Sequence, residues 1–272
     1  MNVEMSSSID LVTLSERPDL CFAASELNAR CWPMFLLQSK VGDEIENVIS
    51  KQLLSDFQLL ALQFAGTASE KVIGIARSLP FPGLHYSNVD EALPYKGWDA
   101  VISHVSGLCN DHVDAADWLN DVSVGCATSV IVAPEMRGTG LAGRLIAGLA
   151  AIAESKGYKA LVVPVRPTLR SLYPLQSFAE YAAWTRPDGL PFDPWIRTHV
   201  RLGGRIVKVA PHAVTIDGSV MDWSAWTGLT FPCSGHYWIP GGVGPLHISV
   251  ETGQGRYIEP NLWVLHSLCS SL

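Results

Sequence analysis

The architecture of this 272-residue chain can be inferred from one stretch, Val130-Ile131-Val132-Ala133-Pro134-Glu135-Met136-Arg137-Gly138-Thr139-Gly140-Leu141-Ala142. It opens with a β-branched apolar run that predicts a buried strand, continues through a short polar turn, and enters an apolar segment through glycines. That order leaves several backbone N–H groups free at a helix N-terminus, where the helix dipole favours an anion. The stretch therefore predicts a phosphate-binding loop.

The segment after the glycines has helical periodicity. Leu141, Leu145, Leu149 and Ile152 recur at the spacing of one buried face, which predicts a helix over residues 141–155. Gly157 then stands where a C-terminal cap is expected.

Two nucleotide-type cofactors fit a loop of this kind. Gly138, Gly140 and Gly143 spell G-x-G-x-x-G, which is the spacing of dinucleotide-binding folds. In those folds the glycines follow the strand almost directly, and an acidic residue ends the next strand. Here five residues intervene, and the next predicted strand ends at Arg166. An arginine could contact a 2′-phosphate, so this alternative stays open.

The stretch also resembles the pyrophosphate loop of the GCN5-related N-acetyltransferases (GNAT). Their pattern, V-x-P-x-x-R/Q-x-x-G-x-G/A, is filled without a gap by Val132, Pro134, Arg137, Gly140 and Ala142. The resemblance implies acetyl-CoA as the co-substrate and no metal. It also implies a cofactor-binding set, namely Val130, Ile131, Val132, Arg137, Gly138, Thr139, Gly140, Leu141 and Ala142.

Patterning along the chain predicts an α/β fold. We expect a strand over 11–14, helices over 19–38 and 42–57 (the first interrupted near Pro33), and strands over 59–64, 72–76, 126–132 and 161–165. The GNAT resemblance implies a mixed, mostly antiparallel central sheet flanked by helices. It further implies that the strand over 161–165 is parallel to the strand over 126–132 and splays from it to admit the pantetheine arm.

The domain organisation follows the same reading. Residues 1–185 are expected to form the acyl-CoA-binding core, and 79–120 are an insertion that could serve as a substrate wall, with a helix over 99–109. Residues 186–272 are expected to be β-rich and packed on the core as one structural unit, with short strands over 199–209, 213–216, 236–239, 247–250 and 262–265. The amino-acid sequence of this part resembles that of a longer acetyltransferase subfamily with a C-terminal extension, also found joined to carbon–nitrogen hydrolases.

Composition sets further bounds. The net charge of −7 disfavours a broad electrostatic grip on nucleic acid, and no apolar run reaches the ~18 residues of a membrane span. Met1–Asp10 is unlike a signal peptide. Six cysteines without a CxxC pair predict reduced, mostly buried thiols in a cytoplasmic protein, and the scattered histidines predict no metal site.

Candidate catalytic groups are fewer. The run from Arg166 to Tyr173 resembles the family's N-x-x-A-x-x-L-Y, with Arg166 in place of the usual Asn and Pro174 following. The resemblance implies that Tyr173 is the general acid, because a phenol suits protonation of a departing thiolate; the other interpretation is packing under the cofactor. Cys126-Ala127-Thr128-Ser129 offers no carboxylate, so no general base is assigned. Upstream candidates are Asp111, Asp114, Asp117, Asp121, His104 and His112.

The resulting functional prediction is an N-acyltransferase that moves an acetyl group from acetyl-CoA directly to an amine of a small or amino-acid-like acceptor. One alternative is a transferase using aminoacyl-tRNA in specialised metabolism, which would need a basic stripe of Arg166, Arg170, Arg197 and Arg201. Another is a non-catalytic CoA-binding module. Trp195, Trp223, Trp226, Tyr237, Trp238 and Trp263 either line an aromatic pocket or form core. An edge strand in the C-terminal half could pair across a homodimer.

Overall fold

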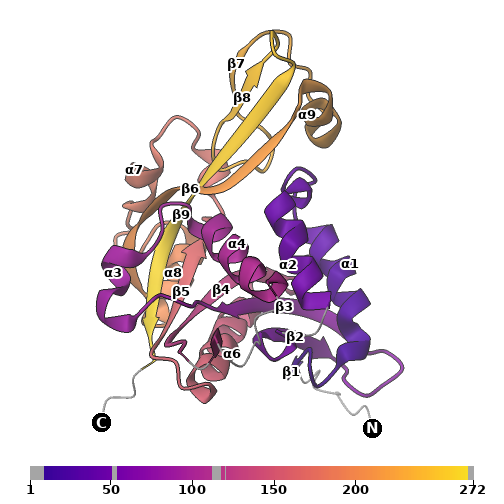
Figure 1. Cartoon of the computed structure of the whole chain (residues 1–272), viewed down its shortest axis with the longest axis vertical. Coiled ribbons are helices and arrows are strands. Elements are labelled where there is room, and N and C mark those ends of the chain that lie inside the picture. Colours follow the sequence, from indigo (N-terminus) through magenta and orange to yellow (C-terminus); the bar gives the residue numbers. More distant parts are fainter. Residues whose placement is uncertain (1–8, 51–53, 112–117, 120, 269–272) are drawn as a thin grey trace.

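The strand–loop–helix stretch lies at the centre of a nine-stranded sheet (Figure 1). This computed structural model describes residues 9–50, 54–111, 118–119 and 121–268. The strands are β1 Ile9–Thr13, β2 Gln58–Gln63, β3 Lys71–Pro80, β4 Val124–Val132, β5 Ala160–Val165, β6 Arg205–Ser219, β7 Gly235–Tyr237, β8 Leu246–Ser249 and β9 Gln254–Ser267. The helices are α1 Cys21–Cys31, α2 Lys40–Ser50, α3 Val89–Ala92, α4 Gly97–Asn110, α6 Leu141–Ser155, α7 Phe178–Ala182, α8 Pro194–Arg201 and α9 Val220–Thr227.

The sheet has the order β1-β2-β3-β4-β5-β9-β8-β7, with β6 paired along β9. Neighbouring strands are antiparallel except β4 and β5, which are parallel. Helices α1, α2 and α4 lie above the strands in Figure 1, and α6 lies below them. The predicted mixed, mostly antiparallel sheet flanked by helices is therefore confirmed.

Strands β4 and β5 pair over only three residues. Val124 to Cys126 lie beside Ala160 to Val162, and no pairing follows. Beyond that point β4 stays paired with β3 up to Val132, and β5 stays paired with β9 up to Val165. The two strands diverge because each is held on its outer edge, and the splay expected from the sequence is present.

A β-bulge marks the start of the divergence. The register passes from Ala127–Ser78 to Ser129–Arg77, so Thr128 has no partner on β3. Bulges of this kind bend a strand and re-aim a side chain. Here the Thr128 hydroxyl turns back onto the carbonyl of Arg77, at 3.3 Å.

Helix α6 has the predicted bounds, Leu141–Ser155. Leu141, Leu145 and Leu149 are buried against the sheet, while Ile152 is half-buried. Gly157 follows with φ +81°, as expected for the residue after a helix C-terminus.

The C-terminal part contains longer strands and more helix than predicted. The expected strand over 199–209 is wrong, because α8 occupies Pro194–Arg201 and β6 begins only at Arg205. Asp193 caps α8, since its Oδ1 accepts from the N–H groups of Trp195 (2.9 Å) and Ile196 (3.2 Å). A capping aspartate followed by proline at the first helical position is a helix start signal that the strand interpretation passed over.

Two predicted strands are pieces of longer ones. The expected strand over 213–216 lies within the 15-residue β6, and that over 262–265 lies within the 14-residue β9. Helix α9 was not expected, although Ser219 and Asp222 form a capping box at its start. Helix α7 over Phe178–Ala182 carries Tyr181 and ends before Trp184.

Long β6 and β9 join two hydrophobic cores. One half of β9 lies between β5 and β6, and the other half lies between β8 and β6. The outer halves, with β7, β8 and α9, extend away from the main sheet in Figure 1. They enclose a second apolar cluster around Trp223 and Tyr257, to which Phe35 from the N-terminal segment contributes.

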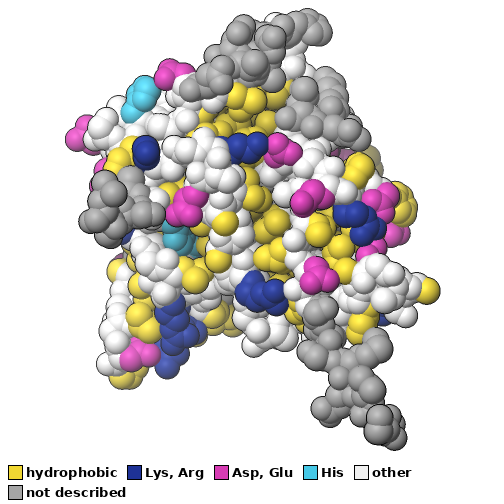
Figure 2. Space-filling view, turned by 90° about the horizontal axis from the view of Figure 1, so that it is seen from below, with side chains coloured by type: hydrophobic (Ala, Val, Ile, Leu, Met, Phe, Trp, Pro, Cys, Tyr) yellow, Lys and Arg dark blue, Asp and Glu magenta, His cyan; other side chains and the backbone are white. Residues whose placement is uncertain are grey.

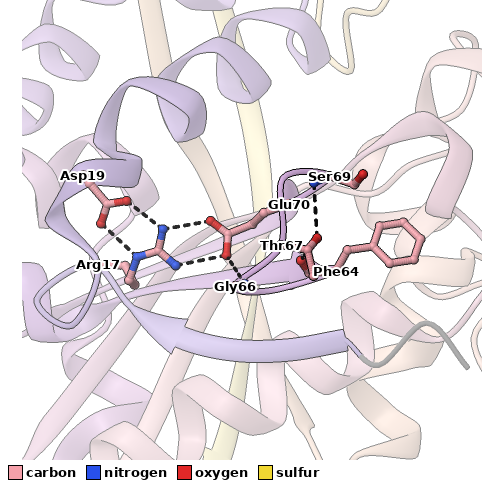
Figure 3. Close-up of polar contacts among 7 residues, drawn as sticks. All are labelled: Arg17, Asp19, Phe64, Gly66, Thr67, Ser69 and Glu70. Carbon is pink, nitrogen blue, oxygen red and sulfur yellow. Dashed lines mark hydrogen bonds and ion pairs between the residues drawn. The ribbon is translucent and has the colours of Figure 1, made fainter. Parts of the chain in front are cut away.

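Arg17 ties the start of α1 to the turn between β2 and β3 (Figure 3). Its guanidinium donates to Asp19 (Nε–Oδ1 2.8 Å) and to Glu70 (Nη2–Oε1 2.8 Å). Glu70 also accepts from the N–H of Gly66 at 2.8 Å, in a turn opened by Phe64 at φ +57°. Because Asp19 is exposed and Arg17 and Glu70 are only partly buried, we expect them to orient the turn and α1 more than to stabilise the chain.

Five cysteines fall among the described residues. Cys126 is buried and Cys233 is exposed, whereas the remaining three are half-buried. The prediction of mostly buried thiols is therefore wrong, and Cys269 lies outside the described residues. No helix in the described part of the chain is long and apolar enough to cross a membrane.

His199 and His266 form a buried pair between α8 and β9. Nδ1 of His199 lies 2.9 Å from Nε2 of His266, and Nε2 of His199 has no hydrogen-bond partner within the described chain. Burial lowers the pKa of His199 to about 3, with His266 adding to the effect, and burial also lowers the pKa of His266. Both imidazoles are therefore neutral in the folded protein at neutral pH.

This pair predicts acid destabilisation. Below about pH 6.5 the unfolded chain binds protons on these imidazoles that the folded chain does not. The free energy of unfolding therefore decreases as the pH is lowered. In urea titrations between about pH 7 and pH 4 we expect a shallower pH dependence for His199→Leu than for the parent. His104→Leu, on an exposed position of α4, is the matched control; an equal slope in all three proteins would contradict the prediction.

Candidate active site

The glycine-rich loop projects from the end of β4 as an exposed turn. Gly138 and Gly140 have φ +81° and +86°, a region that favours glycine, and Gly140 is the N-cap of α6. No side chain caps the helix, so its first N–H groups keep their capacity for a ligand. Thr139 closes the turn by donating to the carbonyl of Met136 at 2.7 Å, and Arg137 is exposed beside it.

The splay supplies backbone groups near this loop. Val130, Ile131 and Val132 pair with β3 on one edge of β4 and have no strand partner on the other. Successive N–H groups of a strand point to opposite edges, so this trio directs at least one N–H toward the opening. Ile131 is buried, and its two neighbours are half-buried.

The opening between β4 and β5 leads into a pocket with an empty volume of about 910 Å³, part of which is open to solvent. Its lining includes Thr128 and Ser129 from β4 and Pro164 from β5. The pocket and the gap between the strands therefore share walls. A group held between the strands would face whatever occupies the pocket.

The far walls of this pocket come from elements distant in sequence. Helix α2 contributes Asp43 and Glu46, the segment after α1 contributes Trp32, and α4 contributes Trp98. The indole Nε1 of Trp98 donates to the carbonyl of Thr128 at 3.0 Å, so α4 is fastened to the bulge of β4.

Three carboxylates line the pocket, and their surroundings differ. Glu259 is 1% exposed and accepts from Arg166 (2.9 Å), Tyr257 (2.7 Å) and Asn261 (3.4 Å). Its oxygens are thus committed to the protein. Glu46 forms an ion pair with Arg77, while the carboxylate of exposed Asp43 has no partner among the described residues.

A further carboxyl group lies on α4, next to Trp98. Asp99 accepts from the N–H of Thr215 through Oδ2 at 2.8 Å, and its Oδ1 is buried without a partner in the described chain. Burial raises the pKa of Asp99 to about 7, opposed by the Thr215 hydrogen bond and reinforced by Glu259. The group carries a proton in the folded protein over much of the acidic range.

Tyr173 follows a short 3-10 turn, Arg170–Leu172. Its half-buried ring lies edge-on to Trp184 (5.0 Å between centroids) and Phe192 (5.6 Å), and tilted against Tyr181 (5.7 Å). Its hydroxyl makes no hydrogen bond to any described residue. The pocket lining does not include Tyr173, so its role as general acid stays a prediction.

Other sequence candidates lie apart from the pocket. Asp111, Asp121 and His104 are exposed and do not line it, whereas His112, Asp114 and Asp117 lie outside the described residues. Trp223 and Trp263 are fully buried core. The tryptophans that do line the pocket, Trp32 and Trp98, were missed, because nothing in their sequence neighbourhood distinguishes a pocket wall from a core position.

The arginines proposed for a basic stripe are mostly used inside the protein. Arg166 pairs with Glu259, Arg170 donates to the carbonyls of Tyr173 and Gln176, and Arg197 donates to two backbone carbonyls. Figure 2 shows Lys and Arg side chains set apart from one another among acidic and apolar ones on the face seen from below. The stripe that would favour aminoacyl-tRNA is thus not formed by these arginines.

Comparison with known proteins gives consistent results. No family model matches the chain. It is 28% identical over 291 residues to an arginine N-acetyltransferase, avaD, of Aspergillus versicolor, covering 98% of this chain and 97% of that protein. The fold is similar to that of the loading GNATL domain of CurA from Lyngbya majuscula (17% identity, 96% and 98% of the two chains, TM-score 0.56). It is also similar to the GNAT-like decarboxylase GphF in complex with isobutyryl-CoA (17% identity, 96% and 100%, TM-score 0.53).

The splayed parallel pair, the glycine-rich loop and the helix after it define a GNAT fold. The chain therefore has a GNAT-like fold and is similar over nearly its whole length to an N-acetyltransferase. Within the described residues, no group of three His, Cys, Asp or Glu side chains is placed to hold a metal ion.

The raised pKa of Asp99, beside the pocket residue Trp98, can be tested by mutation. This pKa is 3.8 in the reference state and about 7 in the fold, so ionisation weakens the folded state increasingly as the pH rises between these values. We expect Asp99→Asn to be more stable than the parent, by a margin that grows from about pH 4 to pH 7 and then levels off, bounded at about 4 kcal/mol. Urea unfolding measures it, with exposed Asp111→Asn as the control; a margin independent of pH would contradict the assignment.

Proposed function

We propose that this protein transfers the acetyl group of acetyl-CoA to an amine of a small, cationic, amino-acid-like acceptor of the arginine class. The observation that carries the proposal is the continuity between the β4–β5 opening and a pocket with acidic and aromatic walls. The donor's thioester and the acceptor's amine can then meet without crossing the sheet.

Donor binding falls to the loop and the strand before it. The pyrophosphate of acetyl-CoA lies against the N–H groups at the start of α6, from Gly138 to Ala142, with Arg137 as the neighbouring cation. The pantetheine arm takes the place of the missing strand partner along Val130, Ile131 and Val132. These residues are assigned because they are exposed or unpaired in the fold and because they match the family's loop pattern.

The transfer itself is direct. The acceptor nitrogen, freed of one proton, attacks the thioester carbonyl carbon, and a β4 N–H donates to the developing oxyanion. The carbon–sulfur bond then breaks, the electron pair leaves with sulfur, and the Tyr173 hydroxyl supplies the proton that forms the thiol. The attacking nitrogen gives up its remaining extra proton as the amide forms, and that proton restores the Tyr173 phenol. Support for Tyr173 comes from its unengaged hydroxyl and from its ring being held by three aromatic neighbours.

The acceptor class rests on charge and on one relative. Asp43 and Glu46 stand three residues apart on α2, so they share a helix face on the pocket side. Trp32 and Trp98 also line the pocket, and indole rings attract cations, as shown by the Arg166 guanidinium carbon 5.9 Å from the Trp32 ring centroid. The relative named as an arginine N-acetyltransferase aligns over nearly the whole chain, which favours an acceptor of that kind.

An assay of thiol release from acetyl-CoA tests the proposal, with L-arginine as the first acceptor. We expect turnover by the parent. Arg137→Glu should raise the KM for acetyl-CoA by about tenfold to a hundredfold, because one charge-assisted contact becomes a repulsion. Arg144→Glu, exposed one turn into α6, is the matched charge-reversal control. No turnover with arginine or any other cationic amine would overturn the proposal.

Tyr173→Phe tests the proton donor. If the phenol protonates the leaving thiolate, kcat should fall by about a hundredfold, while the Kd for acetyl-CoA measured by calorimetry stays unchanged. Tyr95→Phe, at an exposed position, is the matched loss of a hydroxyl. A Tyr173→Phe enzyme with parental kcat would assign the residue to packing alone.

A further inference from the structure

Three polar side chains form a row across the central strands. Gln58 on β2 is the direct cross-strand partner of Arg77 on β3, and Arg77 is the partner of Ser129 on β4. Directly paired residues share one face of a sheet, and this face is the one beneath α1 and α2. The row begins at Ser129, in the pocket beside the β4–β5 opening, here termed the acceptor pocket. From there it leads away from that opening.

The row crosses from the acceptor pocket into a second cavity, here termed the side chamber. The side chamber has an empty volume of about 730 Å³, including its opening, and lies between α1, α2 and the strands β2 and β3. Glu46 and Arg77 line both spaces. Their ion pair therefore lies at the partition between the acceptor pocket and the side chamber. The Arg77 side chain is 11% exposed and the Glu46 side chain 42% exposed.

Gln58 lines the side chamber and has a side-chain oxygen, a hydrogen-bond acceptor, without a donor among the described residues. The residue is 1% exposed, and its Nε2 donates to the carbonyls of Leu54 and Ser78, both at 3.1 Å. These two bonds fix the orientation of the amide. Its Oε1 is consequently buried with no partner in the described chain. A buried acceptor without a donor costs about 1–3 kcal/mol, and such groups commonly mark a place for water or a ligand.

We propose that the side chamber receives the distal end of the acceptor, a guanidinium or a similar nitrogen-rich cation, and that Gln58 and Glu46 select it. The proposal rests on the function proposed above. The guanidinium donates to Oε1 of Gln58 and to the lone pairs of the Glu46 carboxylate that Arg77 leaves free, since a carboxylate offers about four such sites. Arg77 stays paired throughout, so no buried charge is exposed.

The dimensions fit this assignment. Two strand spacings separate Ser129 from Gln58, a span of about 10 Å. An extended chain advances about 3.3–3.6 Å for every three bonds. An arginine whose α-amine lies at the β4 opening therefore brings its terminal nitrogens within hydrogen-bond reach of Gln58, whereas ornithine, which ends before the guanidinium, falls short.

The same geometry accounts for the role of Glu46 in this structure. Its carboxylate already binds a guanidinium, that of Arg77, through two nitrogens. The site is thus matched to a planar, multi-donor cation. Because Glu46 remains 42% exposed and also lines the side chamber, it can accept a second such group from within that chamber.

Selectivity between L-arginine and L-ornithine tests the proposal. We expect Gln58→Met to reduce the ratio of their kcat/KM values by about tenfold to a hundredfold, the loss of one or more hydrogen bonds to a charged group. The KM for acetyl-CoA should not change. Ser25→Trp provides a second variant, because Ser25 is an exposed α1 residue that lines the side chamber, so its bulk fills the space without loss of a buried contact.

Ala29→Trp, exposed one turn further along α1 and outside both cavities, is the matched control and should keep the parental ratio. An unchanged ratio in Ser25→Trp, with arginine turned over normally, would overturn the side-chamber proposal alone. If the parent turns over no cationic amine, the proposed function fails. In that case calorimetric titration of L-arginine tests the side-chamber proposal separately. Binding that is lost in Ser25→Trp and kept in Ala29→Trp supports the proposal, whereas no binding to the parent overturns it.

Discussion

Strands β4 and β5 separate after three paired residues, and the positions of the loop, the pocket and the C-terminal extension depend on this separation. A strand that loses a neighbour exposes backbone donors and acceptors, which is costly unless something else binds them. Here the outer edges are secured, β4 by β3 and β5 by β9. The inner edges are therefore free to hold a thioester arm, and the bulge at Thr128 sets where that freedom begins.

The C-terminal extension completes this arrangement. Without β9 the parallel strand β5 would be an unsupported sheet edge, so the extension shares its sheet with the site. It also carries Glu259, which holds Arg166 at the pocket through a buried ion pair. Burial lowers the pKa of Arg166, but the neighbouring Glu259 more than offsets this and leaves it raised. The arginine in the position of the family's usual asparagine is thus held by a partner that lies 93 residues away in sequence.

The geometry of the glycine-rich loop could be predicted from sequence because it depends on local backbone conformation. Glycines at positive φ, a helix start and a preceding strand are encoded within a dozen neighbouring residues, and α6 has the bounds that its periodicity indicated. The acceptor pocket differs in this respect. It combines α2, the segment after α1, α4, β4, β5 and β9, and no local pattern records that Trp32 and Trp98 face a common space.

The errors in the C-terminal part have a related cause. Short apolar runs within 199–265 were each interpreted as a strand, yet long-range pairing with β5, β6 and β8 extends β9 to 14 residues. Conversely, the Asp193–Pro194 cap is a local signal strong enough to start α8, which extends into the first residues of an expected strand.

Local sequence was thus sufficient for the geometry of the glycine-rich loop and for the helix behind it, because each follows from interactions between near neighbours. The arrangement of the core strands was implied only by the GNAT resemblance. The acceptor pocket, the Glu46–Arg77 partition and the unpaired oxygen of Gln58 arise only when strands and helices distant in sequence are brought together, since cross-strand register and burial are properties of the assembled sheet.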